Sequence, residues 1–255
     1  MRAVITGATS GIGLEFAKIL HNMHYDLTLV ARRNDRLLAL KEKFGENTQI
    51  ICADLSVRDE VFRVFSEIQT DETEILINNA GFGLCGDFAE TDMKKELSMI
   101  DVNVTAVYIL TKLFYKEFLK RNSGYILNVS SIASFFPGPL LTSYYASKAY
   151  VRTLTESIRG EIAARRSNIY IGALCPGPVK TEFDRVAEVK FSLKGADAHK
   201  TALYAVKKMF RKKTIILPAF SVKAAVFFSR FVPRGILTKI MYKMQRKKQF
   251  SDKIS

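Results

Sequence analysis

The chain has 255 residues, 48% of them hydrophobic, a length that suits one sizeable core better than two full domains. Its three cysteines lie far apart without a Cys-x-x-Cys pair and its three histidines form no ligand cluster, so we expect neither a disulfide framework nor a metal site. The net charge of +14 is uneven: the segment from Lys207 to Ser255 holds fourteen basic residues against one acid, so it carries +13 and residues 1–206 carry +1.

The chain shows no sign of a targeting or membrane-spanning segment. Residues from Met1 to Gly7 are predicted to run as a strand into a turn, which leaves no room for a secretory signal. Lys223, Arg230 and Lys239 interrupt the apolar C-terminal third, so no stretch reaches the ~18 uncharged apolar residues that a spanning helix needs. We therefore expect a cytoplasmic protein without a transmembrane helix.

Short apolar runs alternate with longer amphipathic stretches as far as about residue 180. Strands are predicted at Ala3–Thr6, Leu27–Ala31, Gln49–Ala53, Ile75–Asn78, Tyr125–Val129 and Tyr170–Leu174. Helices are predicted at Gly13–Met23, Asn34–Phe44, Asp59–Gln69, Val104–Arg121 and Tyr144–Arg165. This alternation predicts a parallel sheet with helices on both faces, a single-domain, doubly wound (Rossmann-like) α/β fold over residues 1–255.

After Pro176 the pattern loosens before a predicted helix at about Asp197–Phe210 and a short strand at Thr214–Leu217. A segment inserted here lies beyond the carboxyl edge of the sheet, where open α/β proteins bind ligands. We therefore predict a substrate lid over residues 182–212. Its apolar residues, among them Phe183, Phe191 and Leu193, suggest an apolar substrate.

A glycine-rich turn follows the first predicted strand. Residues 6–13 read Thr-Gly-Ala-Thr-Ser-Gly-Ile-Gly and lead into the first predicted helix. Glycines here let the backbone turn tightly and approach a pyrophosphate, which then meets the positive end of the helix. The turn therefore predicts a dinucleotide site that includes Gly7, Ser10, Gly11, Ile12 and Gly13. The alternative is a tight connection without a ligand.

The end of the second strand indicates which dinucleotide binds. An acidic residue there would bond a ribose 2′-hydroxyl, whereas this chain has Arg32 and Arg33 after Ala31. A guanidinium pairs with a phosphate, so we predict NADP(H), with Arg32 and also Ser10 or Arg33 at the 2′-phosphate. Alternatively, both arginines are solvated surface charges.

Tyr144 and Lys148 lie four residues apart on a predicted helix, so both side chains point to one face. A free phenol titrates near ~10 and needs a fixed cation before it serves as an acid or base at neutral pH. Lys148 is predicted to lower the pKa of Tyr144 in this way, together with an oxidised nicotinamide. By itself the spacing also occurs by chance on surface helices.

Together, these motifs resemble those of the short-chain dehydrogenase/reductase family, from residue 1 to about residue 183. The resemblance rests on the glycine turn, on Asn78-Asn79-Ala80-Gly81 after the fourth strand, on Asn103, on Ser131 thirteen residues before Tyr144, and on Pro176-Gly177 after the sixth strand. It implies that Tyr144 exchanges a proton with the substrate oxygen, Lys148 binds the nicotinamide ribose, Ser131 bonds the substrate and Asn103 holds a water.

The resemblance also assigns further cofactor contacts. It implies that Asp54 and Leu55 contact the adenine, that Val179 and Thr181 face the nicotinamide amide, and that Asn79, Ala80, Gly81 and Pro176 border the dinucleotide. From the residues alone, Asp54 could equally be the N-cap of the following helix. The neighbouring Tyr145 and Ser130 fail the family spacing and are interpreted as structural.

The segment 219–255 is a basic amphipathic extension. After Pro233 and Gly235, one helical face is predicted to carry Ile236, Leu237, Ile240, Met241 and Met244, whereas Lys239, Lys243, Arg246 and Lys247 lie largely opposite. This pattern is typical of a helix that lies on a membrane surface. The alternatives are that the apolar face closes the protein's own pocket or a subunit interface. A nucleic-acid partner is not expected.

We therefore expect an NADP(H)-dependent oxidoreductase that interconverts a carbonyl and a secondary alcohol of an apolar substrate, such as a ketosteroid or a 3-oxoacyl chain. The resemblance implies a homodimer or homotetramer that pairs through the predicted helices Val104–Arg121 and Tyr144–Arg165. The alternative from another class is a non-catalytic NADPH-binding regulator or a scaffold on a membrane surface.

Overall fold

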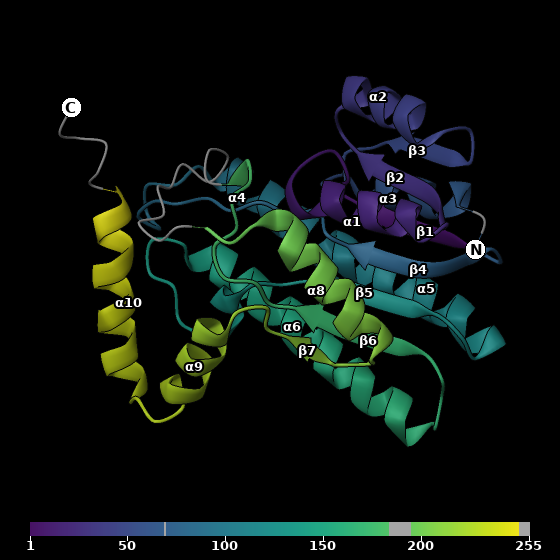
Figure 1. The fold of residues 1–255 in the computed structure, drawn as a ribbon. Coiled ribbons are helices and arrows are strands. Elements are labelled where there is room, and N and C mark those ends of the chain that lie inside the picture. Colours follow the sequence, from purple (N-terminus) through teal and green to yellow (C-terminus); the bar gives the residue numbers. More distant parts are fainter. Residues whose placement is uncertain (69, 184–194, 250–255) are drawn as a thin grey trace.

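The computed structural model describes residues 1–68, 70–183 and 195–249. Its centre is a seven-stranded sheet in the order β3-β2-β1-β4-β5-β6-β7, in which every pair of neighbours is parallel (Figure 1). The strands are β1 (Arg2–Thr6), β2 (Asp26–Ala31), β3 (Thr48–Cys52), β4 (Thr73–Asn78), β5 (Tyr125–Val129), β6 (Tyr170–Leu174) and β7 (Ile215–Ile216). This topology confirms the predicted doubly wound fold.

Helices cover both faces of this sheet (Figure 1). They are α1 (Gly11–Asn22), α2 (Asn34–Phe44), α3 (Arg58–Glu67), α4 (Met93–Ile100), α5 (Val107–Arg121), α6 (Thr142–Ala164), α8 (Ala198–Phe210), α9 (Phe220–Ser229) and α10 (Arg234–Gln249). Two short helical segments complete the set, a π-helix η1 (Asp101–Ala106) between α4 and α5 and a 3-10 helix η2 (Ile132–Phe135) after β5.

Alternation along the central strands divides the interior into two cores. Ala3 and Ile5 of β1 point into a core that α1, α2 and α8 cover, whereas Val4 points into a second core under α3, α5 and α6. Strands buried on both faces must be apolar at nearly every position, which explains runs such as Leu27–Val30. The carboxyl ends of β1, β2 and β4 are thereby fixed side by side.

The second half of the segment predicted as a lid belongs to the body of the fold. Ala202, Ala205, Val206 and Met209 form a buried stripe by which α8 packs in the same core as α1. This burial makes α8 a helix that covers the sheet. Phe191 and Leu193 lie outside the described residues.

The helix predicted at Val104–Arg121 starts earlier than expected, because α4, η1 and α5 run on continuously from Met93. By length and composition this helix could cross a membrane, but half of its most apolar window is buried. Ile109, Leu110, Phe114 and Phe118 lie in the second core, so its apolar character is accounted for by packing on the sheet.

The predicted apolar face of α10 is only partly buried in the structure. Leu237 and Met241 are buried, together with Gln245 on the same helical face, whereas Ile236, Ile240 and Met244 remain about half exposed. Figure 1 shows α9 and α10 at the end of the molecule remote from α2.

Candidate active site

The glycine turn links β1 to α1 at the carboxyl edge of the sheet. Gly7 and Gly11 have φ of +66° and +55°, which side chains with a Cβ rarely adopt. The backbone N–H of Gly7 donates to the carbonyl of Val30 at 2.8 Å, so β2 holds the start of the turn in place. The side chain of Ser10, the N-cap residue of α1, makes no capping bond.

Gly13 is the residue of the turn with the least room. A Cβ at this position would come within 2.3 Å of the Gly7 carbonyl oxygen and 2.4 Å of the Asn79 amide nitrogen. The Asn79 side chain donates to the carbonyls of Thr6 and Gly7 at 3.0 and 3.2 Å, and the N–H of Ala80 donates to the Thr6 hydroxyl at 3.0 Å. The end of β4 thus fixes a backbone cradle at the N-terminus of α1, the arrangement that suits a pyrophosphate.

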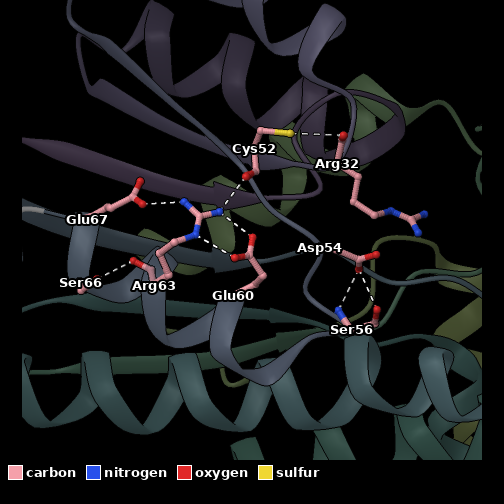
Figure 2. Close-up of polar contacts among 8 residues, drawn as sticks. All are labelled: Arg32, Cys52, Asp54, Ser56, Glu60, Arg63, Ser66 and Glu67. Carbon is pink, nitrogen blue, oxygen red and sulfur yellow. Dashed lines mark hydrogen bonds and ion pairs between the residues drawn. The ribbon is translucent and has the colours of Figure 1, made fainter.

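Of the two arginines after β2, Arg33 reaches the cradle and Arg32 does not. The Arg33 guanidinium donates to the hydroxyls of Thr9 and Ser10 at 3.2 and 3.1 Å. Arg32 is exposed, and Figure 2 shows no bond from its guanidinium to the labelled residues around it. Of the two predicted arginines, Arg33 is thus the one that lies beside Ser10.

The carboxylate of Glu182 also holds Arg33. It accepts from Arg33 at 2.8 Å and from Arg36 at 3.1 Å, and this pair of guanidiniums lowers the pKa of Glu182 to about 2. Glu182 is the first residue of the segment predicted as a lid. No local pattern predicts this contact, because the partners are 149 and 146 residues apart in the sequence.

Asp54 and Leu55 follow β3. One Asp54 carboxylate oxygen accepts from the N–H and the hydroxyl of Ser56 at 3.0 and 2.9 Å (Figure 2). Because the N-cap of α3 is Val57, Asp54 shapes the turn before the helix and does not cap it. The Leu55 side chain is buried in the second core, which leaves its backbone at the edge of the sheet.

Tyr144 lies in the first turn of α6, opposite Ser131, the N-cap residue of η2. Burial raises the pKa of Tyr144 to about 12, although the nearby Ser131 side chain lowers it. This direction differs from the predicted depression by Lys148. The physical reason is that removing the phenolate from water outweighs the stabilisation available to it within the chain.

Lys148 is 5% exposed, one turn further along α6. Its Nζ donates to the carbonyl of Val129 at 3.0 Å and lies 5.9 Å from the centre of the Tyr144 ring. Burial lowers the pKa of Lys148 to about 8, so the ammonium form still predominates at neutral pH. Ser130 donates to the backbone carbonyl of Lys148 at 2.8 Å, a bond that agrees with a structural interpretation of this serine.

Asn103 lies in η1, where the helix widens into π geometry. Its side-chain amide donates to the Phe82 carbonyl at 2.9 Å and to the Ser147 hydroxyl at 3.1 Å, and its oxygen accepts from the Phe82 N–H at 3.1 Å. A Cβ on Gly81 would come within 2.7 Å of that oxygen and 3.1 Å of the Lys148 Nζ. Asn103, Gly81 and Lys148 thus converge on one point.

The loop after β6 closes the other side of the site. The carbonyl of the buried Pro176 accepts from the Ile132 N–H at 2.8 Å, and Val179 forms a β-bridge with Ala196. The Thr181 side chain lies against Gly11, since a Cβ there would be 3.0 Å from its methyl group. The Phe183 ring lies 5.3 Å from that of Tyr144, so this loop spans from the glycine turn to the tyrosine.

A buried polar ladder behind the site was not predicted. The Asn78 amide donates to Asn128 at 2.9 Å and to Thr111 at 3.1 Å, and the Asn128 amide donates to Thr155 of α6 at 3.0 Å. These bonds tie β4, β5, α5 and α6 together directly below Tyr144 and Lys148. Polar residues inside otherwise apolar runs are the one sequence signal that could have revealed the ladder.

Comparison with known proteins gives a consistent result. A model of the short chain dehydrogenase family matches residues 1–190. The very-long-chain 3-oxoacyl-CoA reductase of Anas platyrhynchos is 32% identical over 198 residues, covering 74% of this chain and 63% of the duck protein. The chain therefore spans less than two thirds of that relative.

Solved structures extend the likeness to nearly the whole chain. A short-chain dehydrogenase from Sphingobium yanoikuyae in complex with NADPH superposes with a TM-score of 0.81 at 28% identity, covering 93% of this chain and 95% of that one. A bulky-bulky ketone specific alcohol dehydrogenase from Comamonas testosteroni gives a TM-score of 0.76 at 26% identity, covering 93% and 94% of the two chains.

Proposed function

The chain belongs to the short-chain dehydrogenase/reductase family of oxidoreductases, and from this premise we propose that it is an NADP(H)-dependent enzyme that interconverts a carbonyl and a secondary alcohol. The observation that carries the proposal is the convergence of Ser131, Tyr144 and Lys148: Ser131 lies close enough to lower the pKa of the phenol, and Lys148 is buried beside the tyrosine ring.

The glycine cradle fits the dinucleotide. Because Gly13 has no side chain, the backbone of the turn can pack closely against it. The backbone of residues 7–13 is therefore free to hold a pyrophosphate at the start of α1. Arg33 and Ser10, already bonded to each other, would hold a 2′-phosphate. The NADPH in the Sphingobium relative supports this choice. We expect Arg33→Ala to weaken NADPH binding far more than NADH binding, measured by titrating the cofactor's fluorescence.

Tyr144 is proposed to move the proton. With its pKa raised to about 12, the phenol is protonated at neutral pH and can donate to a carbonyl oxygen as the substrate is reduced. The Ser131 hydroxyl, which lies near the phenol, is proposed to bond the same oxygen. The bound nicotinamide supplies the hydride in this direction and accepts it in the other.

Lys148 and Asn103 are proposed to support this transfer. The Lys148 ammonium, fixed by the Val129 carbonyl, has donors left for a ribose hydroxyl and stabilises negative charge on Tyr144 once the proton has left. Once Tyr144 has given up its proton, Lys148 would return one to the phenolate. Asn103, whose oxygen borders the same space as the Lys148 Nζ, would hold a water that passes a proton from solvent back to Lys148.

The proposed substrate is apolar and lipid-like. Tyr145 and Phe183 lie beside Tyr144, with ring centres 6.1 and 5.3 Å away, so the approach to the phenol is aromatic. The Anas relative acts on a very long 3-oxoacyl chain and the Comamonas relative on bulky ketones. We therefore propose a ketosteroid, a 3-oxoacyl chain or a similar molecule.

We further propose that the chain forms a homodimer or homotetramer through α5 and α6. Tyr108 and Tyr150, one on each helix, are exposed; partial burial and then the nearby Tyr108 raise the pKa of Tyr150. Exposed aromatic rings on two adjacent helices suit a symmetric interface.

The test is NADPH oxidation by the full chain with a panel of ketones and 3-oxoacyl thioesters. Tyr144→Phe should lower kcat by about 10²- to 10⁴-fold without weakening NADPH binding, because only the proton is lost. Ser131→Ala should also reduce turnover. Ser130→Ala is the matched control, since its hydroxyl bonds the backbone and not the phenol.

Tight NADPH binding without turnover of any compound would favour the alternative, a regulator that senses the cofactor. Turnover that survives Tyr144→Phe would contradict the proposed proton donor.

A further inference from the structure

The outer face of α9 is strongly apolar although it is exposed. Phe220, Phe227, Phe228 and Phe231 are 85%, 53%, 64% and 72% exposed. The Phe227 ring lies 5.4 Å from Phe228 and 5.5 Å from Phe231, so three of these side chains form one aromatic cluster. Exposed apolar patches of this kind mark interaction sites.

The inner face of α9 is apolar as well. Val222 and Val226 are buried, and α9 packs against η2 and the turn at Gly177. A helix that is apolar all round is normally enclosed on all sides. Here the fold encloses one side, and among the described residues the aromatic side has no cover.

Basic residues surround this cluster. Lys223 lies on α9, Arg230 is its C-cap residue and Arg234 begins α10, and the segment 220–246 contains no acidic residue. A hollow of about 540 Å³ between the two helices is lined by Arg230, Phe231, Arg234 and Leu237. On α10, Ile236, Ile240 and Met244 continue the exposed apolar surface beside Lys239 and Lys243. We call Phe220, Phe227, Phe228, Phe231, Lys223 and Arg230 the basic aromatic surface.

We propose that the basic aromatic surface docks on an anionic lipid bilayer. The phenylalanine rings enter the interface, and the surrounding ammonium and guanidinium groups meet lipid phosphates, which is the division of roles in helices that lie on membranes. A second copy of the chain is a poor occupant, because a two-fold interface places each surface against itself and would bring +13 segments together.

Docking in this way brings the candidate active site close to the lipid. α9 packs on η2, whose N-cap is Ser131, and Gln245 of α10 donates to the hydroxyl of Tyr145, the neighbour of Tyr144. If the substrate is apolar, as proposed above, it reaches the site from the bilayer. The docking itself does not depend on that proposal.

The test is co-sedimentation of the full chain with vesicles made of equal parts phosphatidylcholine and phosphatidylglycerol, and with vesicles of phosphatidylcholine alone. We expect binding to the anionic vesicles that weakens as salt is raised. Phe227→Ser/Phe231→Ser and Lys223→Gln/Arg230→Gln should each reduce the bound fraction by roughly tenfold.

Phe88→Ser is the matched control, because Phe88 is 65% exposed on the body of the fold, near Asp87 and Glu90. It should bind vesicles as the unaltered chain does. Equal losses in Phe88→Ser and in the α9 variants would overturn the proposal. Failure of the unaltered chain to bind anionic vesicles would also overturn it. An oligomer that dissociates in Phe227→Ser/Phe231→Ser, seen by light scattering, would then indicate a second copy as the partner, and binding of a single-stranded oligonucleotide would indicate a nucleic acid.

Discussion

At the carboxyl edge of the sheet, polar side chains are buried and bonded, whereas on α9 and α10 apolar side chains are exposed and surrounded by charge. Asn79, Asn103 and Lys148 each bond to backbone carbonyls of another segment. The rings of Phe227 and Phe231 contact mainly each other and solvent. In the first region the fold itself supplies the bonding partners, whereas the second is proposed to be covered by lipid. A substitution in the first region should therefore leave vesicle binding unchanged, and one in the second should leave NADPH binding unchanged.

The largest expected effect is that of Gly13→Ala on the first region. The added Cβ would lie 2.3 Å from the Gly7 carbonyl, so the cradle must open. Overpacking of this kind typically costs about 1–3 kcal/mol, so it should weaken NADPH binding by roughly 5- to 150-fold, measured by fluorescence titration. Vesicle binding should persist. Gly160→Ala in α6, where a Cβ meets nothing within 4 Å, is the control and should bind NADPH normally.

Lys148→Met should stabilise the fold while it removes activity. Because burial lowers the pKa of Lys148 to about 8, the unfolded chain binds more protons than the folded chain between pH 8 and the unfolded value near ~10.4. Stability therefore rises with pH across that window, and below it a constant cost of about 3 kcal/mol remains. Methionine removes this cost but also loses the bond to Val129, which contributes about 1 kcal/mol, so the net gain in the free energy of unfolding is about 2 kcal/mol at pH 7.

The measurement is urea unfolding of both chains at pH 7 and at pH 10. The gain from Lys148→Met should be clear at pH 7 and should shrink at pH 10. Lys43→Met, at an exposed lysine of α2, should change stability little at either pH. A gain of equal size at both pH values would exclude the titration of Lys148 as its source.

Glu182→Gln should tighten NADPH binding by roughly two- to fivefold, because a competing carboxylate no longer pairs with Arg33 in a solvated site. NADH binding should change less, since it brings no phosphate to Arg33. Glu60→Gln is the control: Glu60 also pairs with an arginine, Arg63, but away from the glycine turn (Figure 2). Weaker NADPH binding in Glu182→Gln would show that Glu182 helps to hold the cofactor.

The smallest expected effect concerns the junction of the two regions. Gln245 is buried, and its amide donates to the Tyr145 hydroxyl. Gln245→Ala should lower the free energy of unfolding by about 1 kcal/mol and speed hydrogen exchange in α10. NADPH affinity should not move. A large loss of NADPH affinity would show that α10 and the cofactor site are coupled, and would contradict the independence of the two regions.

The sequence predicted the strands closely, and the bounds of β5 and β6 match the structure. Continuous apolar runs between turn residues leave few alternatives. Prediction was weaker for α4, since Met93–Ile100 is charged and packs little; only Met99 is buried there. The sequence also could not predict which residues of the α10 apolar face are buried. Amphipathic spacing shows that such a face exists, but not how much of it packs against the rest of the protein.

The sequence by itself determined the doubly wound fold and placed a glycine turn, two arginines, Asn103, Ser131, Tyr144 and Lys148 at the ends of elements that meet at one edge. Local pattern suffices for this, because parallel strands bring their carboxyl ends together. Only the tertiary structure decided that Arg33 rather than Arg32 reaches Ser10, that Glu182 pairs with it, and that burial raises the pKa of Tyr144. These features depend on contacts between distant segments and on the exclusion of water, which no local spacing records.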